Sequence, residues 1–424
     1  MRQPGNTVNV QAVDAAGPER EAEAPPAARP TLFTRAFVTV AFAELAYFTA
    51  DGVLLPALPR YVEGPLGGGN VAIGLVIGAF SVSAFFLRPL AGMLADRRGR
   101  RLLMVGGGSI FAVSVIAYLF ASSVPVLIAM RLLTGVGEAF FFVGALAANV
   151  DLAPPERRGE AFSFASLALY LGIGAGPFLS EAVIDRFGFD AAWWLAIALA
   201  ATAVGLATRL PAMRPEAGAR EPGRHRLVHR GGLLPGFVLL AAVWGMAGFL
   251  AFVPLYALDI GMGGAGLVLG LFSGIVVLVR SVGARIPDLI GPGRTTRISL
   301  VLATIGLLVV GLWREPAGLI LGAAILGLGV ALFTPGLFSL AVANVPADER
   351  GAVMGTTSAF LDVAFGVGPA TSGFVAAAFG RSGTFIAGAV VSAAGLALVV
   401  ASRLGRTPRA TPPEQRTGAE QGGS

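Results

Sequence analysis

The chain alternates between long apolar segments and short polar breaks along most of its length. Each apolar segment has about 20 residues or more, enough for an α-helix to cross a hydrocarbon layer about 30 Å thick. The short alternating strands of a membrane β-barrel are not seen in the pattern. It therefore predicts an all-α integral membrane protein. The expected spans are residues 36–59, 70–93, 101–122, 125–150, 160–184, 190–211, 235–258, 264–288, 295–314, 316–343, 350–378 and 381–403.

Polar segments divide the twelve expected spans into two groups of six. Residues 1–34 are rich in Ala, Pro and Glu and lack an apolar core, so we expect a disordered tail rather than a signal peptide. Residues 212–234 are a polar linker, and residues 404–424 are expected to be a second disordered tail. The sequence thus predicts two six-helix bundles, at residues 35–211 and 235–403.

Composition agrees with a membrane protein and excludes several kinds of chemistry. The chain is 55% hydrophobic and 13% charged, and it has no cysteine, so disulfides and thiol catalysis are excluded. We find no metal-ligand cluster, no nucleophile–base set and no cofactor loop, and therefore expect no enzyme activity, metal or cofactor. The net charge of +6 comes from arginines near helix ends, which indicate membrane orientation rather than a nucleic-acid partner.

The distribution of these arginines predicts the orientation in the membrane. The turn at residues 94–100, the linker and the segment around Arg350 lie on one side of the expected bundle, together with both tails. Since basic residues favour the cytoplasmic side, we expect both termini in the cytoplasm of a multi-pass plasma-membrane protein, most simply one of a bacterial inner membrane.

The two groups of spans are related by an internal repeat. Residues 74–81 return as residues 266–273 with six of eight residues unchanged, at an offset of 192 residues. The same offset relates Arg88 to Arg280, Asp96 to Asp288, Gly99 to Gly291, and Gly176-Pro177 to Gly368-Pro369. Two six-helix repeats joined by a polar linker are typical of transporters, in which the halves rock about a site near the membrane midplane.

The segment Gly92-Met-Leu-Ala-Asp96-Arg97-Arg-Gly99-Arg100-Arg101 resembles the loop 2–3 signature of the major facilitator superfamily. Arg131-Leu-Leu-Thr-Gly135-Val-Gly137 resembles its helix 4 motif. The resemblance implies a twelve-helix major facilitator fold with two pseudo-symmetric halves. It also implies that Asp96 reaches the start of the eleventh span and latches one conformation. The expected latch residues are Arg88, Gly92, Asp96, Arg97, Gly99, Arg100 and Asp288.

Gly172-Ile-Gly-Ala-Gly176-Pro177 resembles the helix 5 motif of the drug–proton antiporter branch. That motif usually ends in two further glycines, where this chain has Ser180 and Glu181. Small residues let helix backbones approach closely, and Pro177 removes one hydrogen bond of the helix. The resemblance implies antiport, and we expect Gly172, Gly176 and Pro177 to form the antiporter motif.

Charged residues inside the spans are the strongest functional signal, since each costs about 2.5–3.5 kcal/mol at mid-helix. Glu44 and Asp51 are seven residues apart, as are Arg131 and Glu138, so each pair shares a helix face. Helix depths estimated at about 1.5 Å per residue place Arg131 beside Asp51 and Glu44 beside Glu138. Two carboxyl groups close together cannot both ionise easily, so one of them should carry a proton.

The alternative is that these charges are static ion pairs that order the bundle. Asp362 in the eleventh span has no obvious partner in its own half and is a further candidate. The expected proton-coupling residues are Glu44, Asp51, Arg131, Glu138 and Asp362.

The seventh and tenth spans carry aromatic and Met side chains and no charge at their centres. Such side chains offer adaptable apolar surface to a hydrophobic ligand, although ordinary helix packing explains them equally well. The expected substrate-binding residues are Tyr47, Trp244, Met246, Phe249, Phe252, Tyr256, Phe333 and Phe338.

Together these features favour proton-coupled efflux of a small, mostly hydrophobic compound such as a drug or natural product, by rocker-switch alternating access. Its partners would be protons, that compound and the lipid bilayer, and the protein would be a monomer. A transporter of a sugar, an amino acid or another metabolite on the same fold is the first alternative. A non-transporting membrane receptor is the second.

Overall fold

The computed structural model describes residues 31–154, 157–213, 229–283, 286–343, 345–346 and 349–402. Most of both predicted tails and of the predicted linker lie outside these residues. The regular structure in the described residues is helical, as predicted. The helices are α1 (Arg35–Glu63), α2 (Asn70–Arg98), α3 (Arg100–Tyr118), α4 (Val124–Leu152), α5 (Arg158–Phe187), α6 (Phe189–Thr208), α7 (Arg230–Asp259), α8 (Gly266–Val282), α9 (Ile286–Ile290), α10 (Pro292–Leu312), α11 (Pro316–Val342) and α12 (Arg350–Ala401).

Among the described residues, ten helices are long and apolar enough to cross a membrane. One of them, the 52-residue α12, contains Gly380 with φ 75° and ψ 168°, which is not helical and divides α12 into two passes. The 17-residue α8 is a shorter apolar helix, and the short α9 follows it. With α8 as the remaining pass, the twelve predicted crossings are accounted for.

Glycines with positive φ show the repeat in the backbone itself. Gly99 and Gly291 have φ 93° and 85°, and Gly188 and Gly380 have φ 82° and 75°. Both pairs are 192 residues apart, the offset found in the sequence. Glycine adopts this conformation without the steric cost that a Cβ atom brings. Equivalent tight turns therefore join equivalent helices in the two halves.

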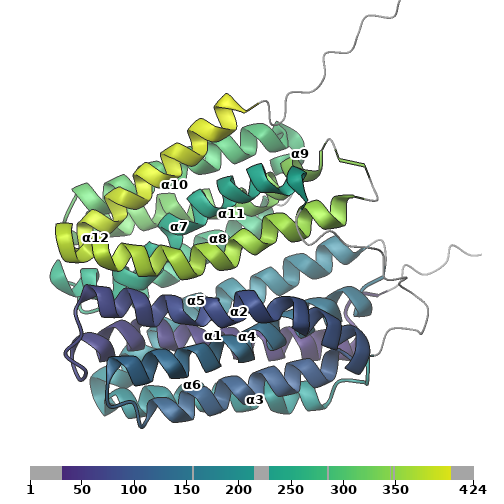
Figure 1. Ribbon diagram of the computed structural model, residues 1–424, viewed down its shortest axis with the longest axis horizontal. Helices are drawn as coiled ribbons and strands as arrows, with labels where there is room; N and C mark the ends of the chain where they lie inside the picture. Colours follow the sequence, from purple (N-terminus) through teal and green to yellow (C-terminus); the bar gives the residue numbers. More distant parts are fainter. Residues whose placement is uncertain are drawn as a thin grey trace, which may run out of the picture. The chain divides into compact units, whose positions relative to one another are not determined.

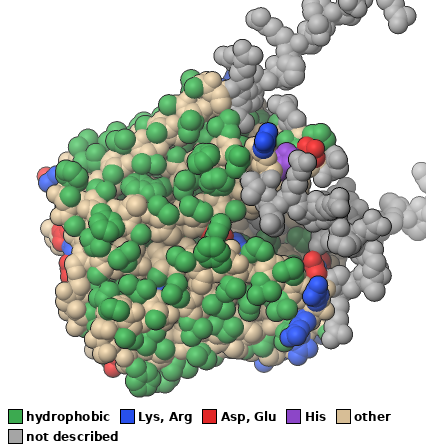
Figure 2. All heavy atoms as spheres, in the orientation of Figure 1, with side chains coloured by type: hydrophobic (Ala, Val, Ile, Leu, Met, Phe, Trp, Pro, Cys, Tyr) green, Lys and Arg blue, Asp and Glu red, His purple; other side chains and the backbone are tan. Residues whose placement is uncertain are grey.

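The two halves are separate groups of packed helices, α1–α6 and α7–α12 (Figure 1). They meet mainly along two seams, where α2 packs against α12 and α5 packs against α8, and α1 also contacts α7. We call the side at which α1 begins and α12 ends the terminal side, and the opposite side the loop side. Figure 2 shows a mostly hydrophobic face with charged side chains mainly at the helix ends. Large apolar side chains such as Phe86, 72% exposed, suit contact with lipid.

Small residues bring the helices of each seam close together, and they do so in equivalent places. A methyl group at Gly366 of α12 would lie 3.2 Å from Ser81 Cβ of α2. A methyl group at Gly174 of α5 would lie 2.8 Å from Ser273 Cβ of α8. Gly174 and Ser81 become Gly366 and Ser273 by the 192-residue offset, so the two seams are built on one plan.

Candidate functional site

Five charged side chains from four helices of both halves form a cluster. They are Asp51 of α1, Arg88 of α2, Arg131 and Glu138 of α4, and Asp362 of α12. Glu138 interacts electrostatically with each of the other four. Asp51 and Glu138 are half-buried, although they lie far from the helix ends. The cluster therefore lies between the halves rather than against lipid.

The direct link between the halves in this cluster is an ion pair. Arg88 Nη2 lies 2.7 Å from Asp362 Oδ1, and the two side chains are 24% and 7% exposed. The Arg88 guanidinium also lies over the Phe142 ring of α4, 4.8 Å from its centroid. Asp362 thus has its partner in the opposite half, and Arg88, which we expected in the terminal-side latch, is a member of the central cluster.

Arg131 does not make the direct ion pair that we expected with Asp51. Its Nε and Nη2 donate to the backbone carbonyls of Val76 and Ile77 in α2, at 3.2 and 3.3 Å. Its guanidinium lies over the Phe80 ring, 4.8 Å from the centroid. Arg131 still interacts electrostatically with Asp51. It therefore ties α4 to α2 and places positive charge in the cluster without neutralising one carboxylate.

Glu44 lies away from the cluster, which corrects the expected pairing with Glu138. It is 3% exposed, and its Oε1 accepts a hydrogen bond of 2.7 Å from Asn149 Nδ2 of α4. Glu44 Oε2 and Asn149 Oδ1 are buried without a hydrogen-bond partner among the described residues. The sequence analysis missed Asn149 because it is uncharged. Its position, eleven residues after Glu138 and hence on the same face of α4, was the available signal.

The structure places most of the expected substrate-binding aromatics inside one bundle or the other. Phe249 is fully buried and packs against Phe272 and Phe385, all within the C-terminal half. The Tyr256 hydroxyl donates to the Val310 carbonyl at 2.9 Å. Tyr47 stacks on Phe141 of α4 at 3.9 Å, within the N-terminal half. For these residues helix packing is the better interpretation. The same applies to Met246, Phe252 and Phe333, which are also buried.

Two of the expected aromatics remain candidates for contact with a substrate. Trp244 of α7 is half-buried, and its Nε1 donates to Thr371 Oγ1 at 2.9 Å. Phe338 of α11 is half-buried as well. These side chains have surface left to offer to a ligand.

Part of the expected terminal-side latch lies around Arg100, which is 3% exposed. Arg100 Nη2 lies 3.2 Å from Asp96, its Nε lies 2.7 Å from Asp151, and its Nη1 donates to the Ala95 carbonyl. Gly99 forms the turn before it, and Arg97 lies in the last turn of α2. A methyl group at Gly92 would meet open space. The side chain of Asp288 lies outside the described residues.

The helix 5 motif packs α5 onto two neighbours. Methyl groups at Gly172 and Gly176 would lie 2.5 and 2.4 Å from the backbone of Phe48 and Gly52 in α1. Gly174, between them, faces α8 of the other half. Pro177 lies inside α5, which continues through it as one helix.

The two residues that depart from the antiporter motif both make contacts to other helices. Ser180 Oγ donates to the Val53 carbonyl of α1 at 2.8 Å. Glu181 accepts hydrogen bonds from the first amides of α8, Ala265 N at 2.6 Å and Gly266 N at 2.8 Å. The departures therefore add polar contacts at the loop side.

The chain is similar in sequence to one family of known proteins. The family model described as Major Facilitator Superfamily matches residues 40–316 and 265–422. An uncharacterized MFS-type transporter of Salmonella typhimurium is 30% identical over 367 residues, covering 84% of this chain and 93% of the relative. Another from Burkholderia mallei strain SAVP1 is 32% identical over 377 residues, covering 85% and 89%.

Solved structures with the same fold belong to transporters of different compounds. A nucleoside transporter aligns with a TM-score of 0.72 at 15% identity, covering 86% of this chain and 99% of its own. The human organic anion transporter aligns with a TM-score of 0.66 at 22% identity, covering 88% and 100%. At these identities the likeness establishes the fold alone.

Proposed function

Because the chain belongs to the major facilitator superfamily, and is thus a multi-pass membrane transporter rather than an enzyme, we propose that it is a proton-coupled antiporter. Its substrate would be a small, mostly hydrophobic compound such as a drug or natural product, and it would export this compound by rocker-switch alternating access. Both termini would lie in the cytoplasm, and the membrane would be a bacterial inner membrane.

The charge balance of the central cluster carries this proposal. Fully ionised, the cluster has two arginines and three carboxylates, so it keeps one negative charge in excess. An uncompensated charge inside a protein is costly, and one proton removes it. Since Arg88 and Asp362 belong to opposite halves, a change of charge in the cluster acts on the contact between the halves.

Glu138 is the best candidate for the proton carrier. Asp362 has Arg88 at 2.7 Å, whereas Glu138 is half-buried and interacts with all four other members of the cluster. When Glu138 is protonated, the positive charges of Arg88 and Arg131 balance the negative charges of the two remaining carboxylates. Glu44, with its partner Asn149, is a second proton-binding candidate nearer the terminal side.

The energy for export would come from the proton itself. A proton that enters down a potential of 100 mV supplies about 2.3 kcal/mol, before any pH gradient is added. The rings beside the cluster, Phe80 and Phe142, together with half-buried Trp244, favour an apolar substrate. The solved relatives include transporters of nucleosides and organic anions, so a polar metabolite is the alternative that the test must separate.

The test uses purified protein in proteoliposomes with an imposed pH gradient. Lipophilic compounds and, separately, sugars, amino acids and nucleosides are added, and substrate-induced proton flux is measured with a pH-sensitive dye. We expect flux with at least one lipophilic compound. We expect Glu138→Gln to abolish that flux while substrate binding persists, because the amide cannot release a proton.

Glu160→Gln is the matched control. Hydrogen bonds of 2.8 Å from the Arg157 guanidinium hold the pKa of the Glu160 carboxyl below its usual value, so this carboxyl stays ionised at neutral pH. Its loss should leave the flux unchanged. Undiminished flux in Glu138→Gln, or flux with sugars but with no lipophilic compound, would overturn the proposal.

A further inference from the structure

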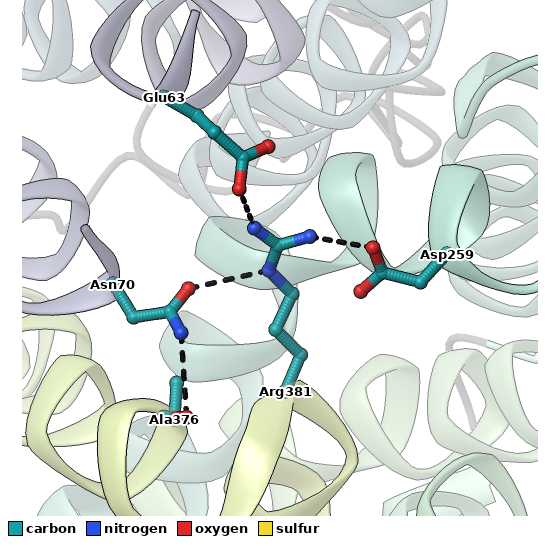
Figure 3. Close-up of polar contacts among 5 residues, drawn as sticks. All are labelled: Glu63, Asn70, Asp259, Ala376 and Arg381. Atoms are coloured by element: carbon teal, nitrogen blue, oxygen red, sulfur yellow. Dashed lines mark hydrogen bonds and ion pairs between the residues drawn. The ribbon is translucent and has the colours of Figure 1, made fainter. Parts of the chain in front are cut away.

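Arg381 joins the ends of four helices on the loop side (Figure 3). Its Nη1 lies 2.7 Å from Asp259 Oδ1 at the end of α7, and its Nη2 contacts Glu63 Oε1 at the end of α1. Its Nε donates to Asn70 Oδ1 at the start of α2, at 3.2 Å. Asn70 Nδ2 in turn donates to the Ala376 carbonyl of α12 at 3.3 Å. All three nitrogens of the guanidinium are thus engaged.

These contacts differ in what they connect. Asp259 and Arg381 both belong to the C-terminal half, so their ion pair survives when the halves move apart. Glu63 and Asn70 belong to the N-terminal half, so their contacts with Arg381 must break. The Arg381 side chain is 12% exposed, whereas those of Glu63 and Asp259 are 44% and 46% exposed. The guanidinium is therefore enclosed, and its carboxylate partners line the rim.

The fold does not require this network, because the repeat lacks it. The 192-residue offset maps Arg381 onto Phe189, Asp259 onto Gly67 and Asn70 onto Met262. Phe189 packs edge-on against the Tyr61 ring, 5.3 Å away and within its own half. Equivalent turns thus hold an aromatic contact within the N-terminal half and a charged contact between the halves.

The second seam is also tied on the loop side, by a different device. The Glu181 carboxylate of α5 accepts from the amides of Ala265 and Gly266, at the start of α8. The repeat places Gly373 at the position equivalent to Glu181. A carboxylate at a helix N-terminus is favourable, and this one comes from the opposite half. The loop side is therefore closed at both seams.

We propose that Arg381 holds a gate on the loop side closed. Its contacts with Glu63 and Asn70 hold the halves together, and their breaking opens the loop side. Asp259 is a positioning residue that keeps the guanidinium paired while the gate is open, which lowers the cost of opening. The gate depends on the chain being a transporter of this family, but not on proton coupling. Its test is therefore independent of the central charge cluster.

The chain has no cysteine, so an introduced cysteine is the sole thiol. Ala370→Cys places one in the α2–α12 seam on the loop-side half, where a methyl group at Gly78 would lie 3.6 Å from Ala370 N. Ser358→Cys places one a helical turn from Asp362, towards the terminal side. Each cysteine variant is labelled in sealed vesicles with a membrane-impermeant maleimide added to one side at a time.

In the Ala370→Cys background we expect Arg381→Gln and Glu63→Gln to raise the labelling rate from the loop side about fivefold or more, by shifting the population of states. Labelling of Ser358→Cys from the terminal side should fall. Asp259→Asn should not raise loop-side labelling, because it leaves the guanidinium with its partners in the other half. Arg186→Gln, at an exposed arginine on the same side, is the control.

A purely structural role would make all three network variants behave alike. Equal loop-side labelling in Glu63→Gln and Asp259→Asn, or labelling in Glu63→Gln no faster than in Arg186→Gln, would therefore overturn the gate. If Arg381→Gln does not reach the membrane, Glu63→Gln decides the outcome by the same threshold, since it leaves the arginine paired with Asp259.

Discussion

At the scale of single residues, equivalent arginines in the two halves have different kinds of partner. Arg88 pairs with Asp362, whereas its equivalent Arg280 donates to Ser166 Oγ at 3.0 Å and lies over the Tyr170 ring, 4.8 Å from the centroid. The 192-residue offset maps Tyr170 onto Asp362. Each arginine thus meets the equivalent position of the opposite half, but its partner there is an aromatic ring at one seam and a carboxylate at the other. Of these two arginines, the one whose partner among the described residues a proton can neutralise is therefore Arg88, in the α2–α12 seam.

The Arg88–Asp362 pair should show strong coupling in a double-mutant cycle. Removing one partner of a buried ion pair leaves the other charge uncompensated, at a cost of about 3–5 kcal/mol. Arg88→Gln and Asp362→Asn should each lower the unfolding temperature in detergent. The double variant should be less destabilised than the sum of the two, by about 1–3 kcal/mol.

The repeat supplies the control for this cycle. Arg280→Gln combined with Tyr170→Phe should show little coupling, because a Phe ring still accepts the guanidinium face and no charge is left unpaired. Additive losses at Arg88 and Asp362, equal to those of the control pair, would contradict a buried ion pair of this strength.

At the scale of elements, α5 packs against helices of both halves. Gly172 and Gly176 lie against α1 of the same half, while Gly174 and Glu181 face α8 of the other. At Gly172 and Gly176 the backbones touch, so an added side chain meets backbone atoms of α1 that cannot rotate away, whereas at Gly174 it meets the side chain of Ser273. The antiporter motif thus has a mechanical meaning in this chain, because it sets how closely α5 approaches both neighbours.

Gly172→Ala should therefore destabilise the protein. Its new methyl group would lie 2.5 Å from the backbone of Phe48, and such overpacking typically costs about 1–3 kcal/mol. Thermal unfolding in detergent should show a lower midpoint for this variant. Gly106→Ala in α3, where a methyl group meets nothing within 4 Å, should leave the midpoint equal or slightly higher. Equal midpoints for both variants would show that α1 and α5 can separate freely.

At the scale of the whole molecule, buried arginines organise both ends. On the terminal side, Arg100 joins Asp96 of α2 to Asp151 of α4, and its amide donates to the Met213 carbonyl at 3.1 Å. These contacts lie within the N-terminal half, whereas those of Arg381 cross between the halves. A transporter must close each side in turn, and a latch in which Asp96 reaches the start of α12 would join the halves on the terminal side.

Asp96→Asn should then slow transport about tenfold and spare both substrate affinity and the amount of protein in the membrane, because the latched state loses stability. Initial rates and equilibrium binding in proteoliposomes measure the two effects. Asp185→Asn removes a surface carboxylate that pairs with Arg60 at 2.9 Å within one half, and it should change neither. If Asp96→Asn reduces only membrane insertion, its role is in topology and not in a latch.

The sequence predicted the spans, the repeat and four of the five residues of the charge cluster, because apolar length and helical spacing are local properties. The fifth, Arg88, was expected in the latch, and Glu44 was expected beside Glu138. The sequence did not predict the partners. Arg88 and Asp362 are 274 residues apart and meet only after the halves pack, which no periodicity encodes. The depth estimate treated α1 and α4 as parallel rods, and so it placed Glu44 beside Glu138 rather than Asn149. The contact between Glu63 and Arg381 could not be predicted for the same reason, because these residues also belong to opposite halves.

The partial exposure of Glu63 and Asp259 links the loop side to the medium around it. Charges that water and ions can reach are screened, over a distance that shrinks from about 30 Å at 0.01 M ionic strength to about 10 Å at 0.1 M. The contact of Arg381 with Glu63 therefore weakens as ionic strength rises, whereas the more deeply buried pair of Arg88 and Asp362 is screened much less. The ionic strength at the loop side would then set how readily that side of the protein opens.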